Sequence, residues 1–338
     1  MKAAVFGAGR MGRRHMQVVR DLGLQLAAVA DPREESLAEA AKEHSLGPGA
    51  LFRDAKSLLA ALAPDVAIVA ATAPAHAELT RLAAAAGARY VLCEKPMASS
   101  LAQCREMIET CERRGTRLAV NHQMRVMDQY VQIKRITEAP DFGGWRSITV
   151  VGGNFGAAMN GTHYFELFRW LSGEAPTEVS AWFAGGPVAS PRGPEFHDRA
   201  GSIRVTSASG RRLYLEIGED QGHGVRATYA GRFGIAVSDE LLGTIHVSTR
   251  READRGLPST RYGLPSLDRV VLAAPNDAVL PTRKVLEALL AGGDYPTGAE
   301  GRLALATLAA AYVSSESGGR PVAVDLDSLP QDRRFDFA

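Results

Sequence analysis

Residues 3–12 read AAVFGAGRMG, a short apolar run followed directly by a glycine-rich turn. Gly7 permits a tight turn out of a strand, Gly9 lets the backbone approach a pyrophosphate, and Gly12 lets the next helix pack closely. The N–H groups and the positive end of that helix then face phosphate oxygens. This stretch predicts a dinucleotide-binding fold, the alternative being an ordinary glycine-rich turn. The predicted cofactor contacts here are Gly7, Gly9, Arg10, Met11 and Gly12.

An acidic residue, Asp31, follows Gly12 at about the 20-residue spacing expected of a residue that reads the ribose. Its carboxylate can accept hydrogen bonds from the adenine-ribose 2′-hydroxyl, and it repels a 2′-phosphate. The pattern therefore favours NAD over NADP as the cofactor. Arg33 weakens that preference, because a nearby arginine can pair with a 2′-phosphate.

The composition is that of an ordinary globular protein, with 46% hydrophobic and 23% charged residues in a chain of 338. That length is enough for about two domains. The 39 basic and 38 acidic residues nearly cancel, and no long basic run supports a nucleic-acid partner. The N-terminus lacks the apolar segment of a signal peptide, and no stretch approaches the roughly 18 apolar residues that span a membrane. We therefore expect a cytoplasmic protein with no membrane partner.

The three cysteines are Cys93, Cys104 and Cys111. An odd number of cysteines without a secretory signal is typical of reduced thiols rather than a disulfide framework. Cys104 and Cys111 are seven residues apart on a predicted helix, where packing explains both. We expect no metal site, because the further ligands that one needs are lacking.

The order of strand-like and helix-like patterns divides the chain. Strands and helices alternate over the first 120 residues, which is typical of a parallel sheet with helices on both faces. Several strand-like runs follow between 177 and 247, which favours an antiparallel sheet. The sequence thus predicts an α/β Rossmann domain at 1–122. An α+β domain at 123–338 is expected to have an open, mainly antiparallel sheet, with the C-terminal helix and strand returning toward the N-terminal domain.

Four stretches carry a family pattern. They are GAGRMGRRH at Gly7–His15, TAPAHAEL at Thr72–Leu79, VLCEKPM at Val91–Met97 and GTHYFELFRWLSG at Gly161–Gly173. They resemble the glucose-fructose oxidoreductase, inositol dehydrogenase and MocA (Gfo/Idh/MocA) family, and residues 295–322 resemble that family's final helix and strand. The resemblance implies oxidation or reduction of a sugar, an inositol or a nucleotide-sugar by a bound nicotinamide. Some members of the family use this chemistry transiently to cleave glycosidic bonds.

Lys95 follows a predicted strand at 90–93, at the sheet edge where open α/β folds bind ligands. A lysine there loses solvation, which lowers its pKa and makes it a useful proton donor or acceptor. The resemblance implies that Lys95 holds the reacting hydroxyl and shares proton transfer, and Lys95 is also a predicted cofactor contact. Glu94 is expected to orient Lys95 or to touch the nicotinamide ribose. The alternative is a solvated lysine on a loop.

His163 lies in the first turn of a predicted helix, with Thr162 before it as a plausible cap. The positive end of a helix favours the neutral imidazole, which can accept a proton from a hydroxyl as hydride leaves the same carbon. In the family resembled, this position is the usual catalytic base. The alternative is a capping or core histidine.

The sequence departs from the family pattern four residues before this histidine, where the family commonly has an aspartate and this chain has Met159. Methionine neither polarises an imidazole nor takes a proton. The next residue, Asn160, can hydrogen-bond a substrate hydroxyl but cannot act as a base. Three outcomes follow: the lysine and the histidine suffice, a carboxylate such as Glu166 or Asp198 substitutes, or simple alcohol oxidation is not the reaction.

Further candidates follow other strands. Thr72, Pro74 and His76 lie near the expected nicotinamide, although a histidine there is more often structural. By the resemblance, Gln123 falls near the nicotinamide. Arg125 either binds a substrate carboxylate or phosphate through its planar fork, or forms a surface salt bridge. The predicted substrate contacts, including one in the glycine-rich run at 152–156, are Lys95, Arg125, Asn154, Asn160 and His163.

Together these residues predict an NAD-dependent oxidoreductase that moves a hydride between nicotinamide and a hydroxyl or keto carbon of a sugar, polyol or nucleotide-sugar. One rival is an NAD-dependent glycosidase or lyase that uses transient oxidation. The other is a non-catalytic NAD-binding sensor. The resemblance also implies a homodimer or homotetramer formed through the C-terminal sheet.

Overall fold

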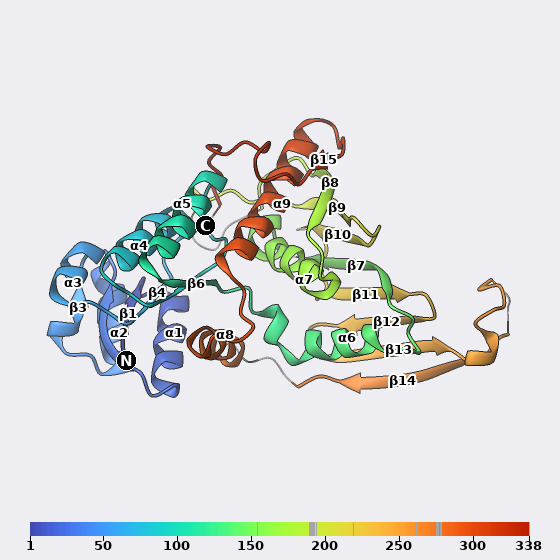
Figure 1. Cartoon of the computed structure of the whole chain (residues 1–338), viewed down its shortest axis with the longest axis horizontal. Coiled ribbons are helices and arrows are strands. Elements are labelled where there is room, and N and C mark those ends of the chain that lie inside the picture. Colours follow the sequence, from blue (N-terminus) through green and yellow to red (C-terminus); the bar gives the residue numbers. More distant parts are fainter. Residues whose placement is uncertain are drawn as a thin grey trace. The chain divides into compact units, whose positions relative to one another are not determined.

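The computed structural model describes residues 1–337 except 154, 189–192, 194, 219, 261–262, 275–276 and 278 (Figure 1). The chain forms two compact units. Unit 1 comprises Met1–Gln123, Asp277–Ala306 and Leu326–Ala338, and unit 2 comprises Met124–Asn276 and Thr307–Asp325.

This division differs from the expected single boundary after residue 122. Helix α8 (Leu280–Ala291) belongs to unit 1 because it packs on α1, β5 and β6 of that unit. The C-terminal segment joins the same unit, where Phe335 N donates to Ser99 O at 2.9 Å. Strand β15 (Val322–Ala323) pairs with β8 and belongs to unit 2.

Unit 1 is built on a parallel sheet whose six described strands lie in the order β3-β2-β1-β4-β5-β6. The neighbouring pairs are all parallel, which confirms the Rossmann prediction. The strand order reverses beside β1, and such a switch point opens a crevice at the carboxyl ends of the strands. The strands are Lys2–Phe6 (β1), Gln25–Ala30 (β2), Leu51–Phe52 (β3), Val66–Val69 (β4), Tyr90–Cys93 (β5) and Arg117–Val120 (β6).

Local sequence explains where the helices of unit 1 begin and end. Helix α5 (Leu101–Arg114) begins after Ser100, whose Oγ accepts from Gln103 N at 3.2 Å. It ends at Gly115 with φ 66°, the left-handed conformation that glycine adopts readily. The remaining helices here are Arg10–Asp21 (α1), Glu34–His44 (α2), Ala55–Ala61 (α3) and Ala73–Ala85 (α4), with 3₁₀ turns at Pro48–Ala50 (η1) and Gln123–Val126 (η2), the last of which crosses into unit 2.

Unit 2 is built on a sheet whose nine described strands lie in the order β14-β13-β12-β11-β7-β10-β9-β8-β15. Strands β7 and β10 are parallel and the other described pairs are antiparallel, so the mainly antiparallel prediction is confirmed. The strands are Trp145–Gly153 (β7), Pro176–Phe183 (β8), Gly201–Ser207 (β9), Arg212–Gly218 (β10), Arg226–Gly231 (β11), Gly234–Asp239 (β12), Thr244–Arg250 (β13) and Ser266–Leu272 (β14).

One face of this sheet is covered. Side chains on β9 and β10 alternate between buried and more exposed positions, as expected when only one face packs against a core. Trp145 of β7 packs edge-on against Phe168 of α7, with ring centroids 5.7 Å apart. The helical segments of this unit are Asp128–Glu138 (α6), Ala157–Gly161 (η3), Thr162–Ser172 (α7) and Glu252–Asp254 (η4).

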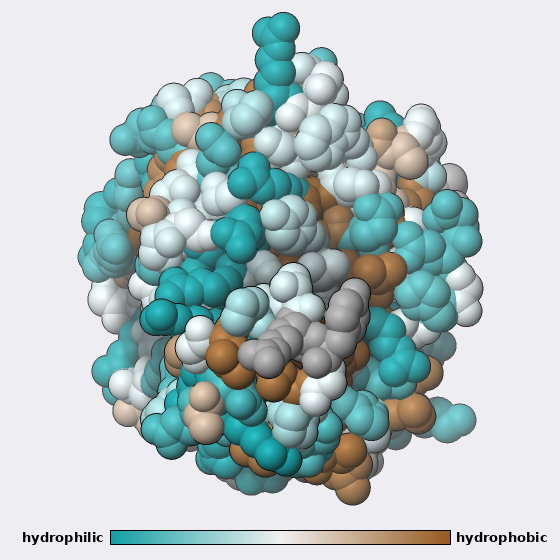
Figure 2. Space-filling view, turned by 90° about the vertical axis from the view of Figure 1, so that its right-hand side faces the viewer, coloured by the Kyte–Doolittle hydropathy of each residue, from teal (hydrophilic) through white to brown (hydrophobic). Residues whose placement is uncertain are grey.

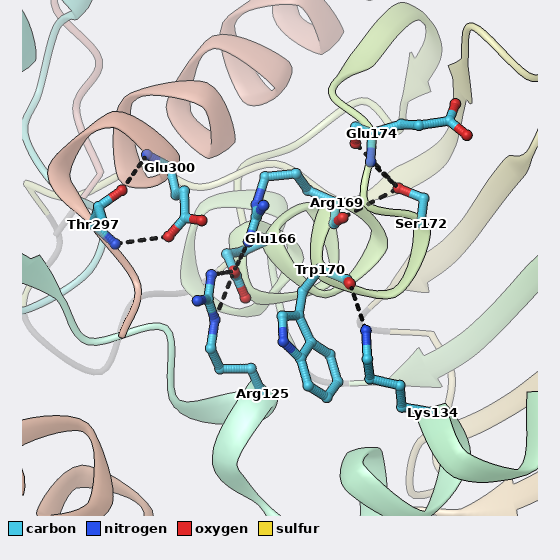
Figure 3. Close-up of polar contacts among 9 residues, drawn as sticks. All are labelled: Arg125, Lys134, Glu166, Arg169, Trp170, Ser172, Glu174, Thr297 and Glu300. Atoms are coloured by element: carbon cyan, nitrogen blue, oxygen red, sulfur yellow. Dashed lines mark hydrogen bonds and ion pairs between the residues drawn. The ribbon is translucent and has the colours of Figure 1, made fainter. Parts of the chain in front are cut away.

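The last long helix, α9 (Gly298–Glu316), begins in unit 1 and ends in unit 2. A reciprocal capping box fixes its start: Thr297 N donates to Glu300 Oε2 at 2.7 Å, and Glu300 N donates to Thr297 Oγ1 at 3.3 Å (Figure 3). Among the described residues, none of the helices is both long and apolar enough to cross a bilayer.

Candidate functional site

The glycine turn between β1 and α1 has the geometry that its sequence predicts. Gly7 adopts φ 103°, and a Cβ there would lie 2.6 Å from Ala70 O. A Cβ on Gly12 would lie 1.8 Å from Gly7 O, so only glycine fits. Gly9 is the extended residue before α1 and has no side chain to cap it. The first N–H groups of α1 therefore lie at the carboxyl end of β1, where they suit an anion.

Asp31 ties this turn to the end of β2. Its Oδ2 accepts from Ala8 N at 2.8 Å, and its Oδ1 accepts from Arg33 N at 2.9 Å and from Arg33 Nε at 3.3 Å. The Asp31 side chain is 4% exposed, whereas that of Arg33 is 67% exposed. The structure thus brings both predicted selectivity residues to the turn. It also gives Asp31 an anchoring role that the spacing alone did not indicate.

Glu94, at the end of β5, lies at the centre of a buried polar cluster. Its Oε1 lies 2.7 Å from His15 Nε2 and accepts from Asn121 Nδ2 at 2.8 Å. Burial raises the pKa of Glu94, but hydrogen bonds from His15 and Asn121, with electrostatic interactions with His15 and Lys95, outweigh burial and hold that pKa well below its usual range. Glu94 is therefore an anion at neutral pH.

Lys95 lies two residues after the end of β5, at the sheet edge predicted for it, and is half-buried. Its backbone N donates to Glu94 Oε2 at 3.3 Å, and the Lys95–Pro96 peptide bond is cis. The anionic neighbour therefore holds the backbone from which the lysine side chain extends. The proton-transfer role of Lys95 stays a prediction.

His76, in the first turns of α4, has both ring nitrogens against backbone oxygens. Nδ1 lies 2.9 Å from Pro96 O, and Nε2 lies 3.1 Å from Ala71 O. The ring is fully buried. It connects the loops after β4 and β5, which favours a structural role. Cofactor contacts by His76, by the neighbouring Thr72 before α4 and by the exposed Pro74 stay predictions.

Thr282 of α8 completes this edge of unit 1. Asn121 Nδ2 donates to Thr282 Oγ1 at 3.1 Å, and Thr282 Oγ1 donates to Gln123 Oε1 at 2.9 Å. The predicted cofactor residue Gln123 is thereby connected through Asn121 to Glu94. Sequence reasoning missed Thr282 entirely and missed the role of His15. His15 stood within a family stretch, but Thr282 carried no local signal.

In unit 2, His163 is 7% exposed and lies near the start of α7. The expectation of a helix N-terminus capped by Thr162 is wrong. A π-helical turn, η3, runs directly into α7, and Thr162 Oγ1 donates back to Ala158 O at 2.9 Å. The positive end of the helical segment therefore lies at the start of η3, about one turn before His163. Helix polarity gives less support to a neutral imidazole than the sequence suggested.

Asp198 places a carboxylate against the backbone of Met159, the position where the family commonly has an aspartate. Its Oδ1 accepts from Ala158 N at 2.9 Å, and its Oδ2 accepts from Met159 N at 2.8 Å. A Cβ on Gly156 would lie 2.2 Å from this carboxyl group. Asp198 is 5% exposed. It thus caps the turn that carries Met159 and the half-buried Asn160.

Glu166 forms a buried ion triad with two arginines (Figure 3). Arg125 Nε donates to Glu166 Oε1 at 3.1 Å, its Nη2 also contacts that oxygen, and Arg169 Nη2 donates to it at 3.2 Å. The Arg125 and Glu166 side chains are 1% and 0% exposed. The arginine is therefore salt-bridged, but in the interior rather than on the surface. Its contact with a substrate anion stays a prediction.

The remaining expectations concern Asn154, a metal site and the cysteines. Asn154 lies outside the described residues. Among the described residues, no group of three or more His, Cys, Asp or Glu side chains is arranged to hold a metal ion. The three cysteines are buried free thiols, and burial raises the pKa of Cys111 to about 12.

Comparison with known proteins identifies the family. Residues 1–122 match the profile of the Gfo/Idh/MocA oxidoreductases, described as an oxidoreductase family with an NAD-binding Rossmann fold. The chain is 30% identical over 283 residues to inositol 2-dehydrogenase 2 of Saccharopolyspora erythraea, covering 77% of this chain and 79% of that protein. It is 31% identical over 212 residues to D-apiose dehydrogenase of Paraburkholderia graminis, covering 56% of each.

The fold has close counterparts among solved structures. An oxidoreductase from Agrobacterium radiobacter, solved with NAD⁺, L-tartaric acid and magnesium, has a TM-score of 0.79 at 18% identity. That match covers 96% of this chain and 98% of the other. The matching profile, the relative from Saccharopolyspora and the shared fold agree, and the chain belongs to the Gfo/Idh/MocA oxidoreductase family.

Proposed function

We propose that this protein is an NAD-dependent oxidoreductase that transfers a hydride between nicotinamide and a hydroxyl or keto carbon of a sugar, inositol or sugar derivative. The observation that carries the proposal is the buried link from the glycine turn to the lysine. His15 of α1 pairs with Glu94, and Glu94 accepts from the Lys95 backbone. A dinucleotide-binding turn and a residue suited to proton transfer are thereby fixed to each other within unit 1.

The residues at this turn fit NAD. Gly7 and Gly12 occupy positions where a Cβ would clash with backbone, and the N–H groups at the start of α1 suit the pyrophosphate. Asp31 is an acceptor suited to the 2′-hydroxyl of the adenine ribose. When bound, the nicotinamide supplies the hydride acceptor or donor. NADP is the less favoured cofactor, because the Asp31 carboxylate opposes a 2′-phosphate, although Arg33 moderates that opposition.

The protein's own contribution is to hold and move a proton. Lys95 holds the reacting hydroxyl, and His163 accepts its proton during oxidation. The two carboxylates considered as substitutes for the missing aspartate have other tasks: Glu166 pairs with two arginines and Asp198 caps the turn at Met159. These contacts favour the outcome in which the lysine and the histidine suffice.

The substrate class rests on the relatives. An inositol 2-dehydrogenase and a D-apiose dehydrogenase are both named for polyhydroxylated substrates, so we propose a cyclic polyol, a sugar or a nucleotide-sugar for this chain. The test is a panel of such compounds with NAD, following both nicotinamide absorbance and product identity. Substrate-dependent NADH formation supports the proposal. Product without NADH accumulation supports the transient-oxidation rival, and tight NAD binding without any turnover supports the sensor.

The open face of the unit 2 sheet supports assembly into a homodimer or homotetramer. Tyr214, Val237 and Val270 lie in one cross-strand row, and their exposed fractions are 37%, 36% and 55%. The space-filling view shows a different side, the right-hand end of Figure 1, where brown hydrophobic residues are scattered among teal hydrophilic ones (Figure 2). Light scattering after size exclusion tests the proposal. A Val237→Asp variant is expected to dissociate, and a wild-type monomer would remove the proposal.

A further inference from the structure

Glu240 of unit 2 has no role in the proposed reaction. Three tyrosines from three elements surround its carboxyl group. Tyr164 Oη of α7 donates to Glu240 Oε2 at 2.6 Å, and Tyr130 of α6 also hydrogen-bonds this group. Tyr229 of β11 lies within electrostatic reach of it. The tyrosines are 2%, 2% and 0% exposed. Glu240 as a residue is half-buried in the turn after β12, with its carboxyl group turned into the interior.

Within the part of the chain that the structure describes, no salt bridge to the Glu240 carboxylate is found. Asp239 is adjacent and repels a second negative charge, while Arg226 Nη1 is committed to Asp239 Oδ2 at 2.6 Å. Tyr229 Oη has no hydrogen-bond partner among the described residues. Burial, with a smaller contribution from Asp239, raises the pKa of Glu240 to about 7, although hydrogen bonds from Tyr164 and Tyr130 oppose the rise.

The Glu240 contact joins two segments that are far apart in the sequence. Tyr164 directly follows His163 at the start of α7, and its ring stacks on Phe155 with centroids 6.2 Å apart. Glu240 N donates to Val225 O at 3.1 Å, which fixes its backbone beside β11. The hydrogen bond from Tyr164 to Glu240 therefore connects the first turn of α7 to the turn between β12 and β13.

We propose that Glu240 is a positioning residue: by holding Tyr164, its protonated carboxyl group sets the first turn of α7 and the orientation of His163, and deprotonation loosens that hold. The ionised carboxyl accepts the tyrosine hydrogen bond more strongly than the neutral form does. It also buries an anion next to Asp239, and because the pKa of Glu240 is raised, this cost of burial outweighs the stronger hydrogen bond. The same turn is open to water, since Leu241 and Leu242 are 79% and 71% exposed. An ionised Glu240 is therefore drawn outward, away from Tyr164. Only the consequence for His163 rests on the proposed function.

Hydrogen–deuterium exchange of the whole protein tests the hold directly and needs no substrate. Amides at the start of α7 are compared at pH values below and above about 7, after correction for intrinsic exchange rates. In the wild type we expect exchange of these amides to rise at least several-fold at the higher pH. A Glu240→Gln variant, which stays uncharged, is expected to lose this pH dependence. A Tyr164→Phe variant is expected to exchange rapidly at both pH values.

The matched control is Glu216→Gln, which neutralises an exposed glutamate on the same sheet and is expected to behave like the wild type. Infrared spectroscopy adds a readout of the group itself: a buried protonated-carboxyl band is expected below pH 7 in the wild type and absent from Glu240→Gln. Exchange in α7 that does not depend on pH in the wild type, or that depends on it equally in Glu240→Gln, would overturn the proposal.

Activity separates this inference from the proposed function. Where a polyol substrate is found, we expect the pH profile of kcat to lose an ionisation near 7 in Glu240→Gln. If exchange and infrared results are as expected and no substrate turns over, the hold on α7 stands and the dehydrogenase proposal fails. If turnover occurs with the same pH profile in both proteins, the dehydrogenase proposal stands and the link from Glu240 to His163 is wrong.

Discussion

His15 Nε2 lies 2.7 Å from Glu94 Oε1, and the two side chains are 0% and 4% exposed. This pair joins the helix after the glycine turn to the strand end that carries Lys95. A buried pair is a weak source of net stability, but removing His15 leaves the Glu94 anion buried with one partner fewer. The contact thus makes the geometry of the predicted cofactor turn and that of the predicted catalytic lysine depend on each other.

Replacing His15 with Ala is expected to destabilise the protein by about 3–5 kcal/mol, because the Glu94 anion stays buried with one hydrogen bond fewer. The measurement is the free energy of unfolding in denaturant. A His15→Ala, Glu94→Gln double variant is the control, and it should recover part of the loss because it carries no buried anion. Equal losses in the single and double variants would mean that the pair is not coupled.

Two buried acids, Glu94 and Glu240, should make the free energy of unfolding depend on pH in opposite directions. The lowered pKa of Glu94 contributes stability that is present above the unfolded value and is lost as pH falls. The raised pKa of Glu240 contributes stability that is present below the unfolded value of 4.5 and is lost as pH rises through about 7. As pH rises across this range, the free energy of unfolding should fall by on the order of 3 kcal/mol. The Glu240→Gln variant should not show this fall. An unchanged loss in that variant would assign the effect to other groups.

A methyl group at Gly12 should disrupt the turn. Gly12→Ala places a Cβ 1.8 Å from Gly7 O, and backbone cannot move aside as a flexible side chain would. We expect a destabilisation of at least about 1–3 kcal/mol and a loss of NAD binding, measured by thermal unfolding and by cofactor titration. Gly49→Ala is the control, since no atom lies within 4 Å of its added Cβ, and it should stay within about 0.5 kcal/mol of wild type. Normal NAD affinity in Gly12→Ala would argue against binding at this turn.

Asp31 should determine the choice between cofactors. Asp31→Ala removes the carboxylate that opposes a 2′-phosphate. The change also removes the hydrogen bond between that carboxylate and Arg33. The ratio of NADP to NAD dissociation constants should fall by about tenfold or more, which corresponds to about 1.4 kcal/mol. Arg33→Ala provides the opposite control, because it leaves the carboxylate in place and should raise that ratio. An unchanged ratio in Asp31→Ala would mean that this residue does not read the ribose.

Lys95→Ala is expected to abolish turnover while NAD affinity stays within a few-fold of wild type, because the glycine turn and the Glu94 hydrogen bonds to His15 and Asn121 do not involve the lysine side chain. Steady-state kinetics and cofactor titration measure the two effects separately. Glu106→Gln, an exposed change on α5, is the control for substitution on the same unit. Wild-type turnover in Lys95→Ala would remove this lysine from the mechanism.

Local patterns were enough to predict much of unit 1. The glycine turn, the acid at Asp31 and the end of α5 at Gly115 each follow from backbone freedom or from spacing along a short segment. Strand–helix alternation likewise predicted the parallel sheet, because parallel neighbours need long crossovers between them. The α-helix predicted here does begin at Thr162, but the expected cap by Thr162 failed for the converse reason: the π-helical turn η3 precedes α7 directly, through residues without a strong helical pattern.

What the sequence determined by itself is chemistry encoded within a few consecutive residues: a turn for phosphates, an acid for a ribose, a lysine at a strand end. Only the tertiary structure decided which distant groups support those residues. Thr282 meets Asn121 across 161 positions, Asp198 caps Met159 across 39, and Glu240 holds Tyr164 across 76. The physical reason is that periodicity and capping arise from neighbours in the chain, whereas these contacts arise from sheet order and helix packing.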